Sequence, residues 1–339
     1  MSTDTTTDPG PGITGDVAAA DQRRDRLIRR LLFGCTSITV LTTIAIFVVL
    51  FDNTWGFFFD ATFSQWLLYS LAGLSAEGLT QRVTFGEFFF DTEWRPSHAD
   101  DPRFGIPTLI SATLLITVGA AFVAIPIGTA AALYLSEYAS ARTRRYLKPT
   151  LEVLAGVPTI VYGFFAVSFV TPVLLRSVLE MFGISIGRNN ALSAMVVVGI
   201  MTIPMVASIS EDAMQAVPDD LRDGAYALGA SKYEVSTSVV LPASISGVFA
   251  SYILAVSRAI GETMAVTLAA GATATFVASP LAEVQTMTAY MVTTMRSTAS
   301  VGSVTYQSLF AVGLVLFLMT LVANLINDYI KRRYREVYQ

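Results

Sequence analysis

Residues 31–51 read LLFGCTSITVLTTIAIFVVLF, a run of 21 residues without a charged side chain. A helix needs about 20 apolar residues, at about 1.5 Å of rise each, to cross the hydrocarbon core of a bilayer. A cleaved signal peptide has a shorter apolar core and a small-residue cleavage site. The run therefore predicts an uncleaved membrane-spanning helix near the start of the chain.

Five more segments of the 339-residue chain have the length and the low charge of a membrane span. The composition agrees, because 53% of the residues are hydrophobic and 14% are charged, whereas a soluble chain carries about 25% charge. These observations predict an all-α polytopic membrane protein with six transmembrane helices. The five segments are 104–136, 153–175, 189–210, about 239–274 with Arg258 and Glu262 inside it, and the apolar part of 297–327.

The basic residues orient these spans. With a cytoplasmic N-terminus, most of the 22 lysines and arginines fall on the inner side, as the positive-inside rule requires. The fifth segment could instead form two spans, 235–257 and 263–282, but seven spans would place the basic C-terminal segment outside. We therefore expect a multi-pass plasma-membrane protein, in contact with lipid, whose N- and C-termini are both cytoplasmic.

Three regions follow from this layout. Residues 1–26 are rich in Ser, Thr, Asp, Pro and Gly and predict a disordered cytoplasmic tail. Residues 27–106 hold the first transmembrane helix and a long extracellular loop, in which 61–76 predicts a helix at the membrane interface. The acidic residues of this loop form either a solvated surface or a barrier to anionic solutes. Residues 107–335 form a core of five transmembrane helices with a cytoplasmic loop at about 211–242.

Several kinds of chemistry are missing from the sequence. With one cysteine, Cys35, and one histidine, His98, the chain cannot form an internal disulfide or build a histidine metal site. No phosphate-cradling Walker loop, nucleophile elbow or zinc-protease helix motif occurs. We therefore expect no catalytic site, no metal and no cofactor in this chain, with energy supplied by a partner. A transporter subunit, an ion-coupled carrier or channel, and a membrane enzyme without a recognisable site remain.

The loop between the fourth and fifth spans has the signals of a short helix. Pro218 and the acids after it favour a helix N-terminus, and Gly229 favours its end after Leu228. Leu221, Ala225 and Leu228 would share an apolar face. Such a face suits either docking into a groove on another protein or packing on the bilayer surface.

The same loop resembles the EAA loop of ABC importer permeases, whose pattern is E-A-A-x3-G-x9-I-x-L-P. In that family the loop is a coupling helix that seats in the ATP-binding subunit, so the resemblance implies a coupling role here. Ala225, Gly229, Leu241 and Pro242 match the pattern, Val239 replaces isoleucine, and Asp223 and Gly224 depart from Glu and Ala.

The fifth span carries two charges four residues apart, Arg258 and Glu262, which a continuous helix would place on one face. A charge at the centre of a bilayer costs at least about 2.5 kcal/mol, so such residues face a cavity or a partner. Arg258 could meet a passing oxyanion while Glu262 holds the arginine. A mutually neutralising structural pair is the alternative.

The surrounding string, residues 257–266, is similar to that of phosphate permeases of the PstC type within the binding-protein-dependent transport family. Further matches are residues 154–163, 134–138, 201–204 and 208–213, so the resemblance covers about 105–335. It implies the type I ABC importer permease fold, with Arg258, Glu262 and Thr263 along the substrate path. Permeases for sulfate or molybdate, and less favourably an ion-coupled carrier, are the alternatives.

The implied partners are those of a phosphate importer. They are a second, PstA-type permease, a dimer of ATP-binding subunits that holds ATP and Mg, and an extracellular phosphate-binding protein that delivers phosphate. Nothing in the sequence implies a nucleic-acid partner.

Overall fold

The computed structural model describes residues 13–59, 62–71, 82–98, 101–276, 279–296 and 300–335. The chain divides into two compact units, Met1–Asp52 and Asn53–Gln339. The first unit is built around α1 (Ile13–Phe58), whose last residues belong to the second unit. Its described part from 24 to 58 is long and apolar enough to cross a membrane, which agrees with the span predicted at 31–51.

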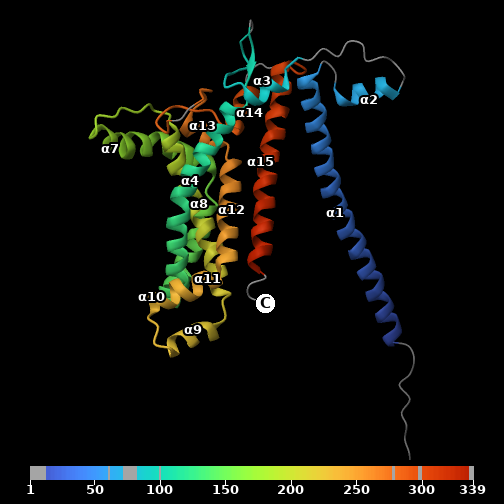
Figure 1. Ribbon diagram of the computed structural model, residues 1–339. Helices are drawn as coiled ribbons and strands as arrows, with labels where there is room; N and C mark the ends of the chain where they lie inside the picture. Colours follow the sequence, from blue (N-terminus) through green and yellow to red (C-terminus); the bar gives the residue numbers. More distant parts are fainter. Residues whose placement is uncertain are drawn as a thin grey trace, which may run out of the picture. The chain divides into compact units, whose positions relative to one another are not determined.

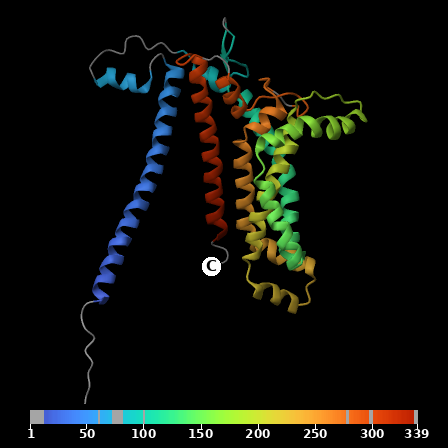
Figure 2. The ribbon, with the colours of Figure 1, turned by 180° about the vertical axis from the view of Figure 1, so that it is seen from behind.

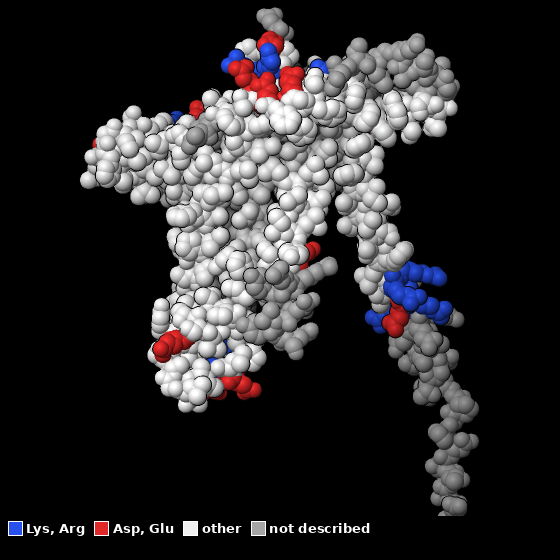
Figure 3. All heavy atoms as spheres, viewed as in Figure 1, with Lys and Arg blue, Asp and Glu red and all other residues white. Residues whose placement is uncertain are grey.

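Helix α1 corrects one prediction. The helix begins at Ile13, so residues 13–26 are helical where the sequence favoured disorder. Alanine, arginine and glutamine, which are strong helix formers, make up much of 18–26, and they extend the apolar helix toward the N-terminus. Residues 1–12 lie outside the described residues. Within α1 the basic side chains gather near one end, shown in blue in Figure 3.

The second unit is a helical bundle (Figure 1). Its helices vary widely in length because prolines and glycines interrupt the longer apolar stretches. Their bounds are α2 (Phe63–Leu71), α3 (Phe85–Phe90), α4 (Pro107–Leu133), η1 (Tyr134–Tyr138), α5 (Ala141–Ala155), α6 (Thr159–Phe165), η2 (Ala166–Leu175), α7 (Arg176–Glu180), α8 (Ala191–Gln215), α9 (Asp219–Ala227), α10 (Lys232–Glu234), η3 (Val235–Val240), α11 (Leu241–Ala243), α12 (Ile245–Ile260), α13 (Met264–Ala270), α14 (Met287–Arg296) and α15 (Val304–Arg335). The elements named η are π-helical.

Six candidate spans can be counted in the described residues. Five are continuous helices, 24–58, 107–138, 159–180, 191–215 and 304–330, and the sixth is the pair 232–243 and 245–260, which is bent by 71°. Their order matches the six predicted spans. In the alternative span 263–282, the structure describes 263–276 and 279–282. The helix within these residues is the seven-residue α13, and the chain leaves it at Gly271, whose φ is +93°, so the described residues do not form a seventh span.

Helices α4, α8 and α12 lie side by side, as the opposite views of Figures 1 and 2 show. The α4–α8 contact is the most extensive between two elements of the chain. Glycines allow it, because a Cβ added at Gly128 or at Gly199 would lie 2.7 Å from the Cβ of Val206 or Val123. Small residues let backbones of membrane helices approach closely. The two helices thus form a tightly packed pair.

One end of the second unit is an aromatic cap. Strands β1 (Trp94–Arg95) and β2 (Arg103–Phe104) pair antiparallel, with Trp94 opposite Phe104. Phe57 packs edge-on against Phe88 and Phe104, and Trp94 packs against Tyr290 of α14. The part of the predicted extracellular loop that carries α3, β1 and β2 is therefore folded onto the bundle. Charged side chains surround this hairpin and α9 at the other end, and the described atoms on the face between them are almost free of charge (Figure 3).

The interfacial helix predicted at 61–76 corresponds to α2, which the structure describes from Phe63 to Leu71. Residues 72–76 lie outside the described residues. Trp66 of α2 stacks on Phe63 and lies 5.9 Å from the ring of Trp55.

Candidate functional site

Helix α9 forms the exposed lower end of the bundle (Figure 1). Pro218 precedes it and two acids, Asp219 and Asp220, occupy its first turn, where the positive end of the helix dipole favours them. The predicted short helix is thus confirmed. Its predicted apolar face is divided, because Ala225 packs against an internal cluster while Leu221 and Leu228 are exposed, Leu228 at 91%.

The other residues of the EAA-like pattern fall into two groups, one in α9 and the turn that ends it, and one in and next to α11. Asp223 and Gly224 are exposed on α9. Gly229 ends the turn with φ +86°, a left-handed conformation that other residues adopt only with strain. Leu241 packs on the cluster formed by buried Val217, Val235 and Val240, and Pro242 follows it in α11.

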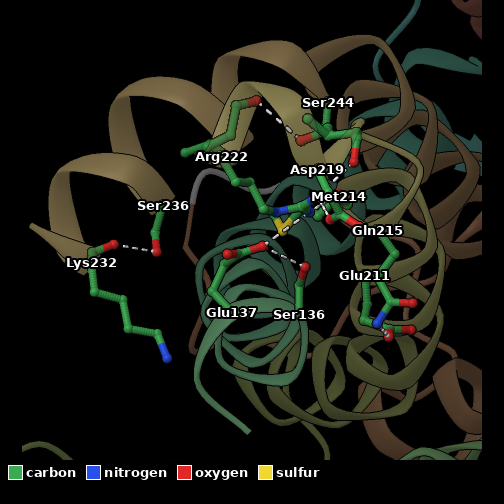
Figure 4. Close-up of polar contacts among 12 residues, drawn as sticks. Ser136, Glu137, Glu211, Met214, Gln215, Asp219, Arg222, Lys232, Ser236 and Ser244 are labelled. Atoms are coloured by element: carbon green, nitrogen blue, oxygen red, sulfur yellow. Dashed lines mark hydrogen bonds and ion pairs between the residues drawn. The ribbon is translucent and has the colours of Figure 1, made fainter. Parts of the chain in front are cut away.

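Arg222 joins α9 to the rest of the bundle (Figure 4). Its Nη1 donates to the carbonyl of Val217 at 2.6 Å and to Asp219 at 3.0 Å. Its Nη2 donates to the carbonyl of Met214 at 2.8 Å and to Glu137 at 3.3 Å. The Arg222 and Glu137 side chains are only 15% and 6% exposed, so their ion pair is largely shielded from water.

A second cluster of charges ties α5 to α8. Glu211 is fully buried, forms an ion pair with Arg144 at 2.5 Å, and accepts hydrogen bonds from Lys148 at 2.7 Å and from Gln215 at 2.6 Å. Lys148 also reaches the exposed Asp212 at 2.5 Å. Partial burial lowers the pKa of Lys148, but the hydrogen bonds and charges of Asp212 and Glu211 outweigh this and raise it above its ordinary value.

Arg258 lies on the wall of a cavity of about 230 Å³ formed by α5, α8 and α12. The same cavity is lined by Glu152 and Ser208, with Leu151, Ala155, Met201, Pro204, Met205 and Ile209 supplying apolar surface. Arg258 and Glu152 are exposed, and neither forms an ion pair or a side-chain hydrogen bond within the described residues. The cavity thus offers a free guanidinium, a hydroxyl and a free carboxylate.

The expected Arg258–Glu262 pair does not form. Helix α12 ends at Ile260, Gly261 caps it, and the turn carries Glu262 away from Arg258. Glu262 is buried and its Oε1 accepts from the backbone N–H of Ala265 at 3.2 Å, at the start of α13. Thr263 donates to the carbonyl of Gly261 at 3.1 Å. The four-residue spacing predicts a pair only if the helix is continuous, and here the helix ends at Ile260 with Gly261 as its cap.

Sequence reasoning gave no site role to several of the charged residues described above, namely Glu137, Arg144, Lys148, Glu152, Glu211 and Arg222. Glu137 and Glu211 lie inside strings that resemble the PstC type, residues 134–138 and 208–213, but neither string carries a motif of known chemistry. Glu152 stands just before the predicted third span, which the structure starts at Thr159 because Pro158 separates α5 from α6.

Comparisons with known proteins agree with this architecture. A probable ABC transporter permease, YqgH of Bacillus subtilis, is 32% identical over 264 residues, covering 77% of this chain and 83% of its own. The phosphate transport system permease protein PstC of Mesorhizobium japonicum is 32% identical over 265 residues, covering 74% and 80%. A crystal structure of a bacterial alginate ABC transporter aligns with a TM-score of 0.58 at 15% identity, covering 93% and 96%.

The alginate transporter supports the ABC importer permease fold alone, because its sequence identity is low. The curated relatives share sequence over most of both chains. Residues 124–336 match the family described as binding-protein-dependent transport system inner membrane component. This chain belongs to that family of multi-pass membrane permeases, and within it to the relatives of the PstC type.

Proposed function

We propose that this chain is the transmembrane permease subunit of an ATP-driven importer for inorganic phosphate. The observation that carries the proposal is the similarity of most of the chain to PstC permeases, one of which is named a phosphate transport protein. The unpaired guanidinium of Arg258 in a cavity between three helices supports it, because a guanidinium binds phosphate oxygens through several parallel hydrogen bonds.

The chain would form half of the translocation path, with a PstA-type permease as the other half. An extracellular phosphate-binding protein would dock at the end of the bundle that carries the aromatic cap. A dimer of ATP-binding subunits would hold ATP and Mg and receive α9 at the opposite end. This chain would hold no ATPase site and no cofactor of its own, and both of its termini would be cytoplasmic.

Transport would proceed by alternating access. Closure of the ATP-binding subunits would move α9, and the movement would reorient α4, α8 and α12 around Arg258. Arg258 would hold the anion during passage, while buried Glu262 and its neighbour Thr263 would fix the turn between α12 and α13 beside the path. Asp223, Gly224, Ala225, Gly229, Leu241 and Pro242 would shape the coupling loop.

Uptake of radiolabelled phosphate tests this proposal, in cells with the intact system and in cells lacking only this chain, with sulfate and molybdate as competitors. We expect deletion to abolish high-affinity phosphate uptake alone, and a plasmid copy to restore it. Unchanged phosphate uptake with loss of sulfate or molybdate uptake would overturn the phosphate assignment and leave the permease family standing. Phosphate uptake by the isolated chain without ATP would favour an ion-coupled carrier.

A further inference from the structure

Two contacts join the coupling loop to the π-helical segment η1, which continues α4 at its α9-facing end. One is the ion pair between Arg222 and Glu137. The other is Lys232, whose Nζ lies 5.0 Å from the centre of the Tyr138 ring, within the range of a cation–π contact. Arg222 and Lys232 lie on either side of Gly229, so the coupling loop contacts adjacent residues of η1 from both sides of its glycine turn.

The hydrogen bonds of Arg222 fix the orientation of its guanidinium. The guanidinium uses both of its terminal nitrogens, and three of its four acceptors, Glu137 and the carbonyls of Met214 and Val217, belong to the bundle and not to α9. Ser136 donates a further hydrogen bond to Glu137 at 2.9 Å, which orients the carboxylate (Figure 4). A planar, preorganised guanidinium in such a site fixes direction as well as distance.

The element that receives these contacts is itself unusual. Residues 134–138 form a π-helix, which occurs mostly as a single turn and often at functional positions. It is continuous with α4, and α4 packs on α8 more extensively than any other pair of elements in the chain. Displacement of η1 therefore has to displace the α4–α8 pair, since close-packed interiors deform little.

Helix α8 then leads to the cavity. Met201, Pro204 and Ser208 of α8 line the wall that faces Arg258. The described residues thus contain an unbroken series of contacts from α9 through Arg222 and Glu137 to η1, α4, α8 and the cavity.

We propose that Glu137 and Tyr138 of η1 are the positioning residues that receive the motion of the coupling loop, through Arg222 and Lys232, and pass it to the α4–α8 pair. This inference rests on the proposed function, because it assigns a transmission route within an ATP-driven importer. Contacts alone do not prove energetic coupling, so the test has to separate transmission from assembly and from ATP hydrolysis.

The experiment uses the complete complex in proteoliposomes, with the binding protein and radiolabelled phosphate, and measures phosphate moved per ATP hydrolysed. The variants are Glu137→Gln, Arg222→Lys, the double variant Glu137→Gln with Arg222→Lys, and Tyr138→Leu. Glu180→Gln is the matched control, because Glu180 is an exposed glutamate in an ion pair on α7, away from the coupling loop. Co-purification of the partner subunits is measured for each variant.

We expect Glu137→Gln to keep co-purification and ATP hydrolysis within about twofold while phosphate moved per ATP falls at least about tenfold, inside the 5- to 150-fold range typical of coupling between sites. The double variant should lose no more than the worse single variant, because the two residues act as one unit. Tyr138→Leu should lose less, since its cation–π contact is exposed. Glu180→Gln should match the wild type.

Unchanged phosphate moved per ATP in both Glu137→Gln and Arg222→Lys would overturn the proposal. Loss of co-purification in both would also overturn it, by making the pair an assembly contact. Equal loss of hydrolysis and transport would place the pair in control of the ATP-binding subunits instead. A wild-type complex that moves no phosphate, but whose ATPase responds to another loaded binding protein, would contradict the proposed function. The same variants, measured with the substrate of that binding protein, would then decide whether Glu137 and Arg222 transmit the motion.

Discussion

The end of the bundle near α9 and the cavity around Arg258 use charge in opposite ways. Near α9, Arg222, Glu137, Glu211 and Lys148 all find partners within this chain. In the cavity, Arg258 and Glu152 find none among the described residues. A buried charge costs free energy unless it is paired, and this applies to Glu211, which is fully buried. Arg258 and Glu152 are exposed, so they need no partner within the chain and can meet a solute in the cavity.

The largest expected effect comes from removing the free charge. We expect Arg258→Gln to reduce phosphate uptake at least tenfold, because a hydrogen bond to a charged group contributes about 1.5–3 kcal/mol and about 1.4 kcal/mol is a factor of ten. Co-purification with the partner subunits should not change, since Arg258 forms no ion pair or side-chain hydrogen bond within the part of the chain that the structure describes. Uptake assays in complemented cells, with Arg258→Lys as the charge-conserving control, check this. Loss of assembly in Arg258→Gln would show that the residue is structural.

Removing a paired charge should affect stability instead. Glu211→Gln would leave Arg144 and Lys148 without their buried carboxylate, and we expect a loss of about 3 kcal/mol, the lower end of the cost of breaking a buried pair, since both cations still reach water. Thermal unfolding of the purified complex measures it. Asp212→Asn is the control, because Asp212 is 62% exposed and an exposed pair contributes at most about 1 kcal/mol.

The same cluster predicts a pH dependence. The pKa of Lys148 is raised in the folded chain, so its contribution to stability is complete below the ordinary lysine pKa and disappears as the pH rises through the raised value. The difference in unfolding free energy between the wild type and Lys148→Met should therefore stay constant between pH 6 and pH 9. A difference between the wild type and Lys148→Met that grows from pH 9 down to pH 6 would contradict this.

The α4–α8 pair, which connects the two regions, can be loosened by a substitution at Gly128. Gly128→Ala would place a Cβ 2.7 Å from the Cβ of Val206, and overpacking of this kind costs about 1–3 kcal/mol. We expect a lower unfolding temperature and reduced phosphate uptake from a looser α4–α8 pair. Gly34→Ala is the matched control, because nothing lies within 4 Å of the added methyl group. Equal behaviour of the two variants would argue against close α4–α8 packing.

The smallest effect is expected on α9. Gly224 lies in the helix with nothing within 4 Å, so Gly224→Ala should stabilise α9 by about 0.5–1 kcal/mol and leave uptake unchanged. Gly229→Ala should be destabilising by about 1–2 kcal/mol, because φ is +86° there. Unfolding temperatures of the two variants should therefore move in opposite directions. A fall in both would mean that α9 is not helical at Gly224.

Much of the fold could be predicted because membrane spans are set by long uncharged runs. The sequence signals around Pro218 and Gly229 also predicted the short helix α9, which we propose to be the coupling helix. The start of α1 was missed because composition alone cannot separate a disordered tail from a charged helix extension. The Arg258–Glu262 pair was wrongly expected because periodicity assumes an unbroken helix. The pairing of Glu137 with Arg222 joins residues 85 positions apart, and no local pattern reports such a contact.

The most direct test of the account uses proteoliposomes that contain the complete complex, with the binding protein and radiolabelled phosphate outside and ATP trapped inside, on the side to which α9 is assigned. We predict that phosphate accumulates inside only when ATP and the binding protein are on opposite sides, and only when this chain is present. Accumulation without ATP, or in vesicles prepared without this chain, would contradict the account.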